Sequence, residues 1–103
     1  MDKAKKAKLE AAGWTVGTAK DFLDLSTEDE AFIEMKLALA AALRQRRVEQ
    51  HLSQVAVAKR LQSSQSRVAK MEMADKTVTV DLLIRSILKL GGTRDLVAAA
   101  LAH

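Results

Sequence analysis

Apolar residues recur at helical spacing along most of this 103-residue chain. The clearest pattern lies between Leu52 and Glu72, where two short amphipathic runs flank a polar turn at residues 62–64. Ser53 precedes the first run and Ser64 precedes the second. Serine is a favoured N-cap because its hydroxyl accepts a hydrogen bond from the first turn of a helix. Two helices of about eight residues joined by about three residues have the dimensions of a helix-turn-helix.

The residue types inside these two runs fit a pair of crossing helices. Ala58 falls where the helices would cross, and only a small side chain allows a close crossing. The predicted apolar seam between the helices consists of Val57, Leu61, Val68 and Met71.

A longer helix is predicted to begin at Ser26, which forms a variant capping box with Asp29. Its apolar residues fall on two faces. One face contains Phe32, Met35, Leu39 and Leu43, and the other contains Ile33, Leu37 and Ala41. We expect one face to meet the helix-turn-helix, and the other to be covered by the N-terminal segment or by a second subunit. His51 is interpreted as a turn residue at the point where this helix must stop.

Two further helices are predicted after the helix-turn-helix. Thr79 caps a helix that runs to about Leu90 and ends at Gly91-Gly92, and Thr93 caps a last helix over residues 94–102. The residues of the first of these helices that we expect to be mostly buried are Leu82, Leu83, Ile84, Ile87, Leu88 and Leu90. Ahead of the long helix, a short helix is expected over residues 18–25.

The composition agrees with an all-α fold of five to seven helices. The chain contains 49% hydrophobic residues but only 3% aromatic ones, with no proline and no cysteine. We expect residues 1–30 to form an N-terminal extension with short helices and residues 31–103 to form one domain. The absence of cysteine favours a reducing cytoplasm. No apolar run approaches the length of a membrane span, so no membrane association is expected.

The positive charge is concentrated around the predicted helix-turn-helix. The formal net charge is +4, and residues 51–76 carry five basic and two acidic residues, whereas residues 1–30 carry five basic and seven acidic residues. A small positive excess is by itself typical of any solvated surface. Next to a helix-turn-helix, it is what a phosphate-facing surface requires.

The run LSQVAVAKRLQSSQSRVAKME, at residues 52–72, resembles the lambda/Cro repressor-like DNA-binding domains, also called the XRE family. The resemblance extends over about residues 37–91. It implies a lambda repressor-like fold and sequence-specific binding to double-stranded DNA. Members of that family commonly have glycine where this chain has Gln62. The resemblance therefore implies a positive φ at Gln62, at a cost of about 1 kcal/mol for a residue other than glycine. They also commonly form an ion pair at the positions of Arg47 and Glu72, which we expect here as a structural clamp.

The second helix of the motif carries the candidate DNA contacts. If Val68 and Met71 face inward, the neighbouring residues point outward or lie on the flanks. The candidate base-reading residues are Gln65, Ser66, Arg67, Ala69 and Lys70. Glutamine matches the edge of adenine, and arginine or lysine matches guanine. The same resemblance implies that Gln54 and Ser64, each at the start of a helix, bind phosphates, and Lys76 is the third candidate phosphate-binding residue. A solvated polar face is the alternative interpretation.

A single motif reads only a few base pairs, so a homodimer on a palindromic operator is predicted. The front of the chain further resembles HigA-like antitoxins, which implies an autoregulating repressor that also neutralises a RelE/HigB-like ribonuclease. Trp14 and Phe22 would supply the apolar anchor of that contact. Two alternatives remain: a stand-alone operon- or phage-type repressor without a toxin partner, and a protein-interaction module with incidental DNA binding.

Catalytic and cofactor chemistry have no motif in this sequence. There is no glycine-rich phosphate loop, and no cluster of His, Cys and carboxylates has the spacing of metal ligands. The sequence therefore predicts a protein that is not an enzyme and that requires neither a metal nor a cofactor.

Overall fold

The computed structural model describes residues 26–102, and within this range every regular element is a helix. The five helices are α3 (Thr27–Glu49), α4 (Gln54–Arg60), α5 (Gln65–Glu72), α6 (Val80–Lys89) and α7 (Arg94–Leu101). This confirms the all-α fold class. The expected helix at residues 18–25 and the anchor residues Trp14 and Phe22 lie outside the described residues.

Each of the five helices begins at a serine or threonine whose hydroxyl accepts a hydrogen bond from a backbone N–H three residues later. The N-caps are Ser26, Ser53, Ser64, Thr79 and Thr93, with N···O distances of 3.0–3.2 Å. These bonds satisfy N–H groups that have no partner inside the helix. The sequence predicted all five caps.

Four of the helices end in the same way, with a residue in the left-handed region followed by a backbone bond that spans five residues. The left-handed residues have φ values of 56° at His51, 54° at Gln62, 54° at Ala74 and 86° at Gly91. After Gln62, for example, the Ser63 N–H donates to the Ala58 carbonyl at 2.8 Å. This is a Schellman-type ending, for which glycine is the usual residue. The expected positive φ at Gln62 is confirmed.

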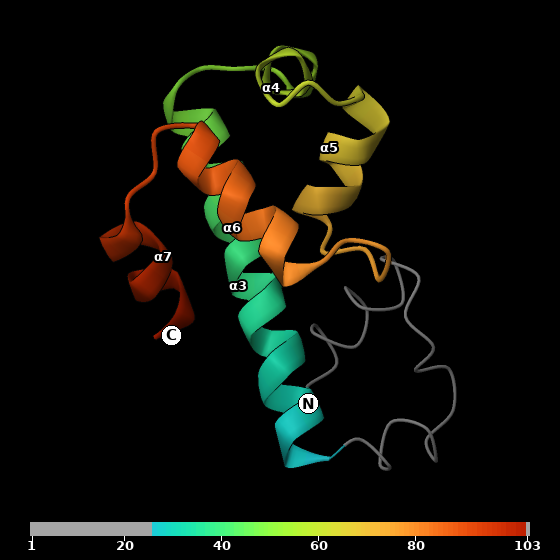
Figure 1. Cartoon of the computed structure of the whole chain (residues 1–103), viewed down its shortest axis with the longest axis vertical. Coiled ribbons are helices and arrows are strands. Elements are labelled where there is room, and N and C mark those ends of the chain that lie inside the picture. Colours follow the sequence, from blue (N-terminus) through green and yellow to red (C-terminus); the bar gives the residue numbers. More distant parts are fainter. Residues whose placement is uncertain (1–25, 103) are drawn as a thin grey trace.

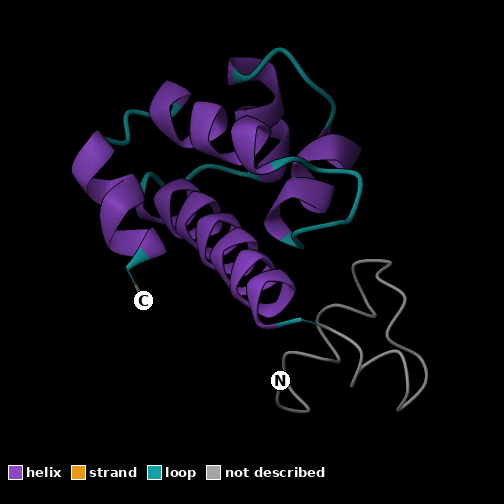
Figure 2. Ribbon diagram, turned by 60° about the horizontal axis from the view of Figure 1, so that its bottom comes forward, coloured by secondary structure: helices purple, strands orange, loops and turns teal. Residues whose placement is uncertain are grey.

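Helix α3 forms the axis of the domain and packs against α5, α6 and α7, while α4 packs against α5 (Figure 1; Figure 2). Leu39 and Leu43 of α3 are fully buried in the core. The core also takes residues from the helices that surround α3: Val57, Ala58, Leu61, Val68, Met71, Leu83, Ile87 and Leu90.

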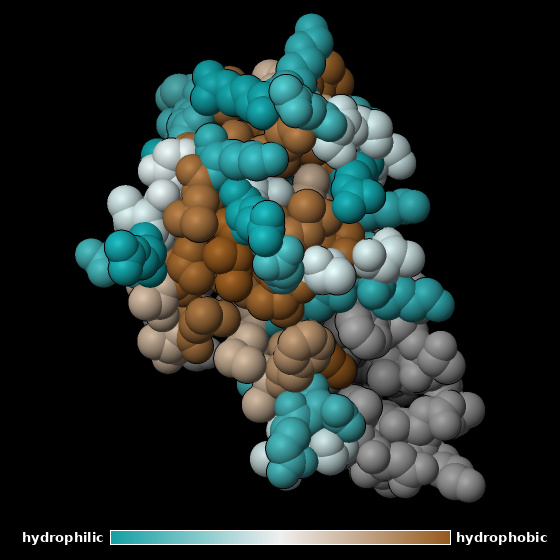
Figure 3. Space-filling model, in the orientation of Figure 1, coloured by the Kyte–Doolittle hydropathy of each residue, from teal (hydrophilic) through white to brown (hydrophobic). Residues whose placement is uncertain are grey.

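Two of the expectations for α3 and α6 need correction. Phe32 is 48% exposed, and Met35 also remains exposed, because the first turns of α3 extend past α6 and α7 (Figure 1). Ile33, from the opposite predicted face, is buried. In α6, Leu88 is 43% exposed and does not belong to the core. Figure 3, in the orientation of Figure 1, shows apolar side chains gathered over α6.

Lys36 of α3 is buried, with only 3% of its surface exposed, and the sequence analysis did not anticipate this. Its ammonium group donates a hydrogen bond to the backbone carbonyl of Asp75 at 2.9 Å. Burial lowers the pKa of Lys36 because it removes the ammonium from water, and the charge of Asp75 partly offsets that effect. The lysine thereby ties the long helix to the link that follows α5.

Candidate nucleic-acid interface

Helices α4 and α5 form the predicted helix-turn-helix. Ala58 is buried between them, and so are the four residues of the predicted seam. Ser64 ends the turn and caps α5, since its hydroxyl accepts from the Arg67 N–H at 3.1 Å. The buried seam therefore fixes which side of α5 faces the core and which side faces solvent.

The outward side of α5 presents polar side chains to solvent. Gln65, Ser66, Arg67 and Lys70 are exposed, whereas Ala69 is half-buried. An exposed row with small residues beside long polar ones leaves room for a helix to approach base edges closely. All five candidate base-reading residues thus lie on or beside one accessible surface of one helix.

The three candidate phosphate-binding residues lie around this surface but not together. Gln54 is half-buried at the start of α4, Ser64 is exposed at the start of α5, and Lys76 is exposed in the link between α5 and α6. The hydroxyl of Ser64 already accepts a bond from within the helix, and it still has a hydrogen to donate.

A hollow of about 290 Å³ lies between α5 and the link that follows it. It is lined by Ser64, Ser66, Arg67, Lys70, Thr77 and Val78. The sequence analysis missed Thr77. Thr77 is held by Asp75, whose carboxylate accepts from the Thr77 N–H at 3.0 Å and from its hydroxyl at 2.7 Å. These hydrogen bonds lower the pKa of Asp75, with a smaller contribution from the charge of Lys70.

Arg47 and Glu72 form an ion pair between the end of α3 and the end of α5. The Arg47 Nε donates to Glu72 Oε2 at 2.7 Å, and Nη2 donates to Oε1 at 2.9 Å. The remaining amino group donates to the Leu52 carbonyl at 3.0 Å. The two side chains are 16% and 4% exposed. The pKa of Arg47 is raised, chiefly by its hydrogen bond to Glu72.

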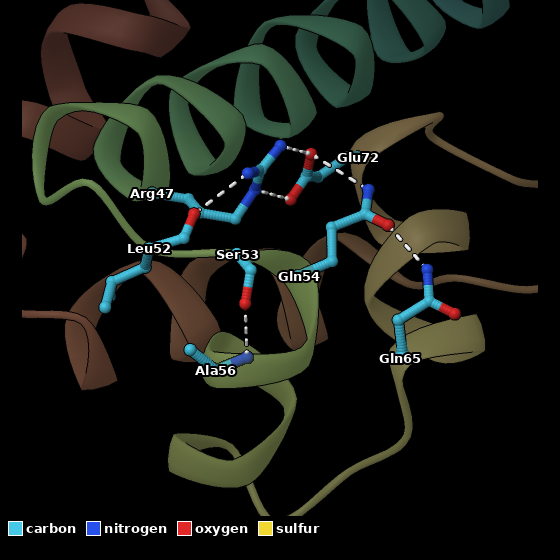
Figure 4. A network of polar contacts seen from close by, with 7 residues as sticks. All are labelled: Arg47, Leu52, Ser53, Gln54, Ala56, Gln65 and Glu72. Carbon is cyan, nitrogen blue, oxygen red and sulfur yellow. Dashed lines mark hydrogen bonds and ion pairs between the residues drawn. The ribbon is translucent and has the colours of Figure 1, made fainter.

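Two glutamines continue from this ion pair to the surface of α5, an arrangement that the sequence analysis did not foresee (Figure 4). The Gln54 Nε2 donates to Glu72 Oε1 at 3.4 Å, and the Gln65 Nε2 donates to Gln54 Oε1 at 2.7 Å. The spacing of eleven residues between the glutamines gave no signal because it crosses the turn. The candidate phosphate-binding and base-reading glutamines are therefore in direct contact.

Within residues 26–102, no group of three or more His, Asp or Glu residues is arranged to hold a metal ion. No helix in the same range is both long and apolar enough to span a membrane.

Comparison with known proteins gives one family. Residues 43–100 match the model of a helix-turn-helix family, and this segment covers more than half of the chain. No match was found among curated proteins or among solved structures. The matched segment contains the end of α3, the whole of α4 to α6 and all but the last residue of α7, and therefore the whole interface described above. The chain belongs to the helix-turn-helix family of DNA-binding regulators.

Proposed function

We propose that this protein is a sequence-specific transcriptional regulator that inserts α5 into the major groove of DNA. The observation that carries the proposal is the exposed polar side of α5, on a helix whose orientation is fixed by a buried seam and by the Arg47–Glu72 pair. A rigid support matters because base readout requires a constant position of the side chains relative to the groove.

In this proposal, Gln65, Ser66, Arg67, Ala69 and Lys70 contact bases. Gln54, Ser64 and Lys76 contact phosphates around them, a role that the exposed positions of Ser64 and Lys76 support. Phosphate contacts set the position of the protein on the duplex, and contacts to base edges carry the sequence information. We assign DNA binding to the domain formed by residues 31–103, with residues 1–30 as an N-terminal extension.

Binding as a homodimer to a palindromic operator is part of the proposal. Two copies related by a two-fold axis would place their recognition helices about 34 Å apart, one turn of B-DNA. The apolar residues that remain exposed on this domain offer surface for such a contact, among them Phe32 and Leu88. Light scattering of the free protein and of its operator complex measures the stoichiometry, and a monomer in both states contradicts this part.

The test of DNA binding uses two variants that each remove one positive charge. Lys70→Ala alters the reading surface, whereas Arg94→Ala alters an exposed residue of α7, on the other side of the domain (Figure 1). The probe is a DNA duplex that the wild-type protein selects from a randomised pool. Lys70→Ala should bind this duplex about 1–3 kcal/mol more weakly than the wild type if the contact is bidentate. Arg94→Ala should bind nearly as well as the wild type. Equal binding by both variants refutes the placement of α5.

We further propose that the regulator is the autoregulating antitoxin of a toxin–antitoxin pair, similar to HigA-like antitoxins. The sequence of residues 1–30 supports this, since it combines net negative charge with the apolar residues Trp14 and Phe22 and suits a basic ribonuclease. Co-expression with the product of the neighbouring gene is the test. If that product is not toxic, or remains toxic in the presence of this protein, the regulator acts without a toxin partner.

A further inference from the structure

The contacts between Glu72, Gln54 and Gln65 form a chain of side-chain hydrogen bonds, which we name the amide relay. It begins at a buried carboxylate and ends at an exposed amide on α5 (Figure 4). An amide has a donor side and an acceptor side, so the relay can run in one of two directions. The direction decides which groups Gln65 offers to a base.

The carboxylate of Glu72 sets this direction. An ionised carboxylate has only acceptor sites, and both of its oxygens here accept from Arg47. Gln54 must therefore turn its NH₂ group toward Glu72, which leaves its oxygen facing Gln65. Gln65 must in turn direct its own NH₂ group at Gln54, as the 2.7 Å bond between them shows. The opposite direction would place two acceptors against each other at Glu72.

At the exposed end, this direction leaves Gln65 with its oxygen and one N–H. One acceptor and one donor match the N6 and N7 positions of adenine. In the opposite direction the oxygen of Gln65 would be used by Gln54, and two N–H groups would remain, which match the N7 and O6 acceptors of guanine. The two directions of the relay therefore correspond to two different bases.

We propose that Glu72 is a positioning residue for base recognition: by accepting from Gln54, it fixes the amide of Gln65 so that it reads adenine and rejects guanine. The inference rests on the proposed DNA binding by α5. It assigns to Glu72 a role in specificity in addition to the role of the Arg47–Glu72 pair in stability.

The experiment measures base preference at one position of the selected duplex. The position read by Gln65 is the one whose preference disappears with Gln65→Ala. The wild-type protein is expected to prefer adenine over guanine there by roughly 5- to 150-fold. Glu72→Gln keeps the shape of the side chain but allows position 72 to donate, so that this preference should fall to within about 3-fold, while preferences at other positions remain.

Arg47→Lys is the control for a purely structural role. It weakens the ion pair and removes the bond to Leu52, but it leaves the carboxylate of Glu72 opposite a cation. Thermal unfolding should show a loss of stability for both variants, yet the preference for adenine should survive in Arg47→Lys. Loss of the preference in both variants, in proportion to stability, overturns the inference.

A second substitution provides a rescue. Gln54→Glu in the Glu72→Gln background places the carboxylate, which can only accept hydrogen bonds, at position 54 instead of position 72. The NH₂ group of Gln65 then again has an acceptor. The preference for adenine should return, although affinity for every sequence should fall because a negative charge is added beside phosphates. An unchanged preference in Glu72→Gln, or no rescue, overturns the inference while DNA binding stands. If the wild-type protein selects no sequence at all, the proposed function fails first.

Discussion

Replacing Gln62 by glycine should stabilise this protein. Gln62 ends α4 with a φ of 54°, in the left-handed region that glycine adopts without steric cost. The side chain is exposed and has none of the hydrogen bonds or ion pairs described for residues 26–102. The substitution therefore removes backbone strain without removing packing.

The magnitude follows from two opposing effects. A residue other than glycine in the left-handed conformation costs about 1–2 kcal/mol. Glycine makes the unfolded chain more flexible, which costs about 0.4–1 kcal/mol on folding. The net expected gain in the free energy of unfolding is about 0.5–1 kcal/mol. For a domain of this size, that gain corresponds to a rise in Tm of about 2–8 °C.

Thermal and urea unfolding of three variants provide the assay. Gln62→Gly should raise Tm. Gln45→Gly makes the same change at an exposed position inside α3. It should lose about 1 kcal/mol or slightly more, because glycine weakens a helix and because the hydrogen bond from Gln45 Nε2 to Glu49 Oε1 is removed. Ala74→Gly should be nearly neutral, since the relief of its φ of 54° is offset by the loss of a buried methyl group worth about 0.8 kcal/mol.

The reasoning is refuted if Gln62→Gly is less stable than the wild type while Gln45→Gly behaves as expected. That result would show that the turn carries no strain, or that the side chain of Gln62 has a role that its exposure conceals.

Three further predictions concern stability. Leu43→Ala, at a fully buried position, should cost about 2–5 kcal/mol in urea unfolding, whereas Met35→Ala at an exposed position should cost about 1 kcal/mol or less; equal losses would contradict the assignment of the core. The pKa of Lys36 is lowered from its usual 10.5, so just below pH 10.5 the unfolded chain binds more protons than the folded protein. The free energy of unfolding of the wild type, relative to that of Lys36→Met, should therefore rise as the pH approaches 10.5. Parallel curves of unfolding free energy against pH for the two proteins would contradict this. The pKa of Asp75 is lowered from 3.8, so its contribution is complete above that pH and is lost as pH falls below it; acid unfolding of Asp75→Ala should lack this component, and an unchanged acid limb would contradict it.

The helix-turn-helix was predictable because its signals are local. A serine N-cap bonds to a backbone N–H only three residues away, as Ser64 does with Arg67, so the residue type alone indicates the helix start. The left-handed conformation of Gln62 was expected from the resemblance to a family that commonly has glycine at this position. The Arg47–Glu72 pair came from the resemblance to a family, since no local pattern connects residues that lie 25 positions apart.

The periodicity of apolar residues in α3 did not predict which of its two apolar faces is buried. A helical pattern shows that Phe32 and Ile33 lie on different faces, but it does not show which face the rest of the chain covers. That depends on which parts of the chain pack against each face. Ile33 is buried whereas its neighbour Phe32 is exposed. Lys36 is buried at a point where the backbone carbonyl of Asp75 accepts a hydrogen bond from its ammonium group.

The sequence by itself determined the helices, their caps and the polar side of α5, because each depends on interactions within a few residues. Only the tertiary structure decided how Gln54 and Gln65 meet and how both connect to Glu72. Those contacts join residues from different helices, and their direction depends on a carboxylate that burial and Arg47 hold in place. Hydrogen-bond direction is a property of packed neighbours, and for that reason no pattern along the chain contained it.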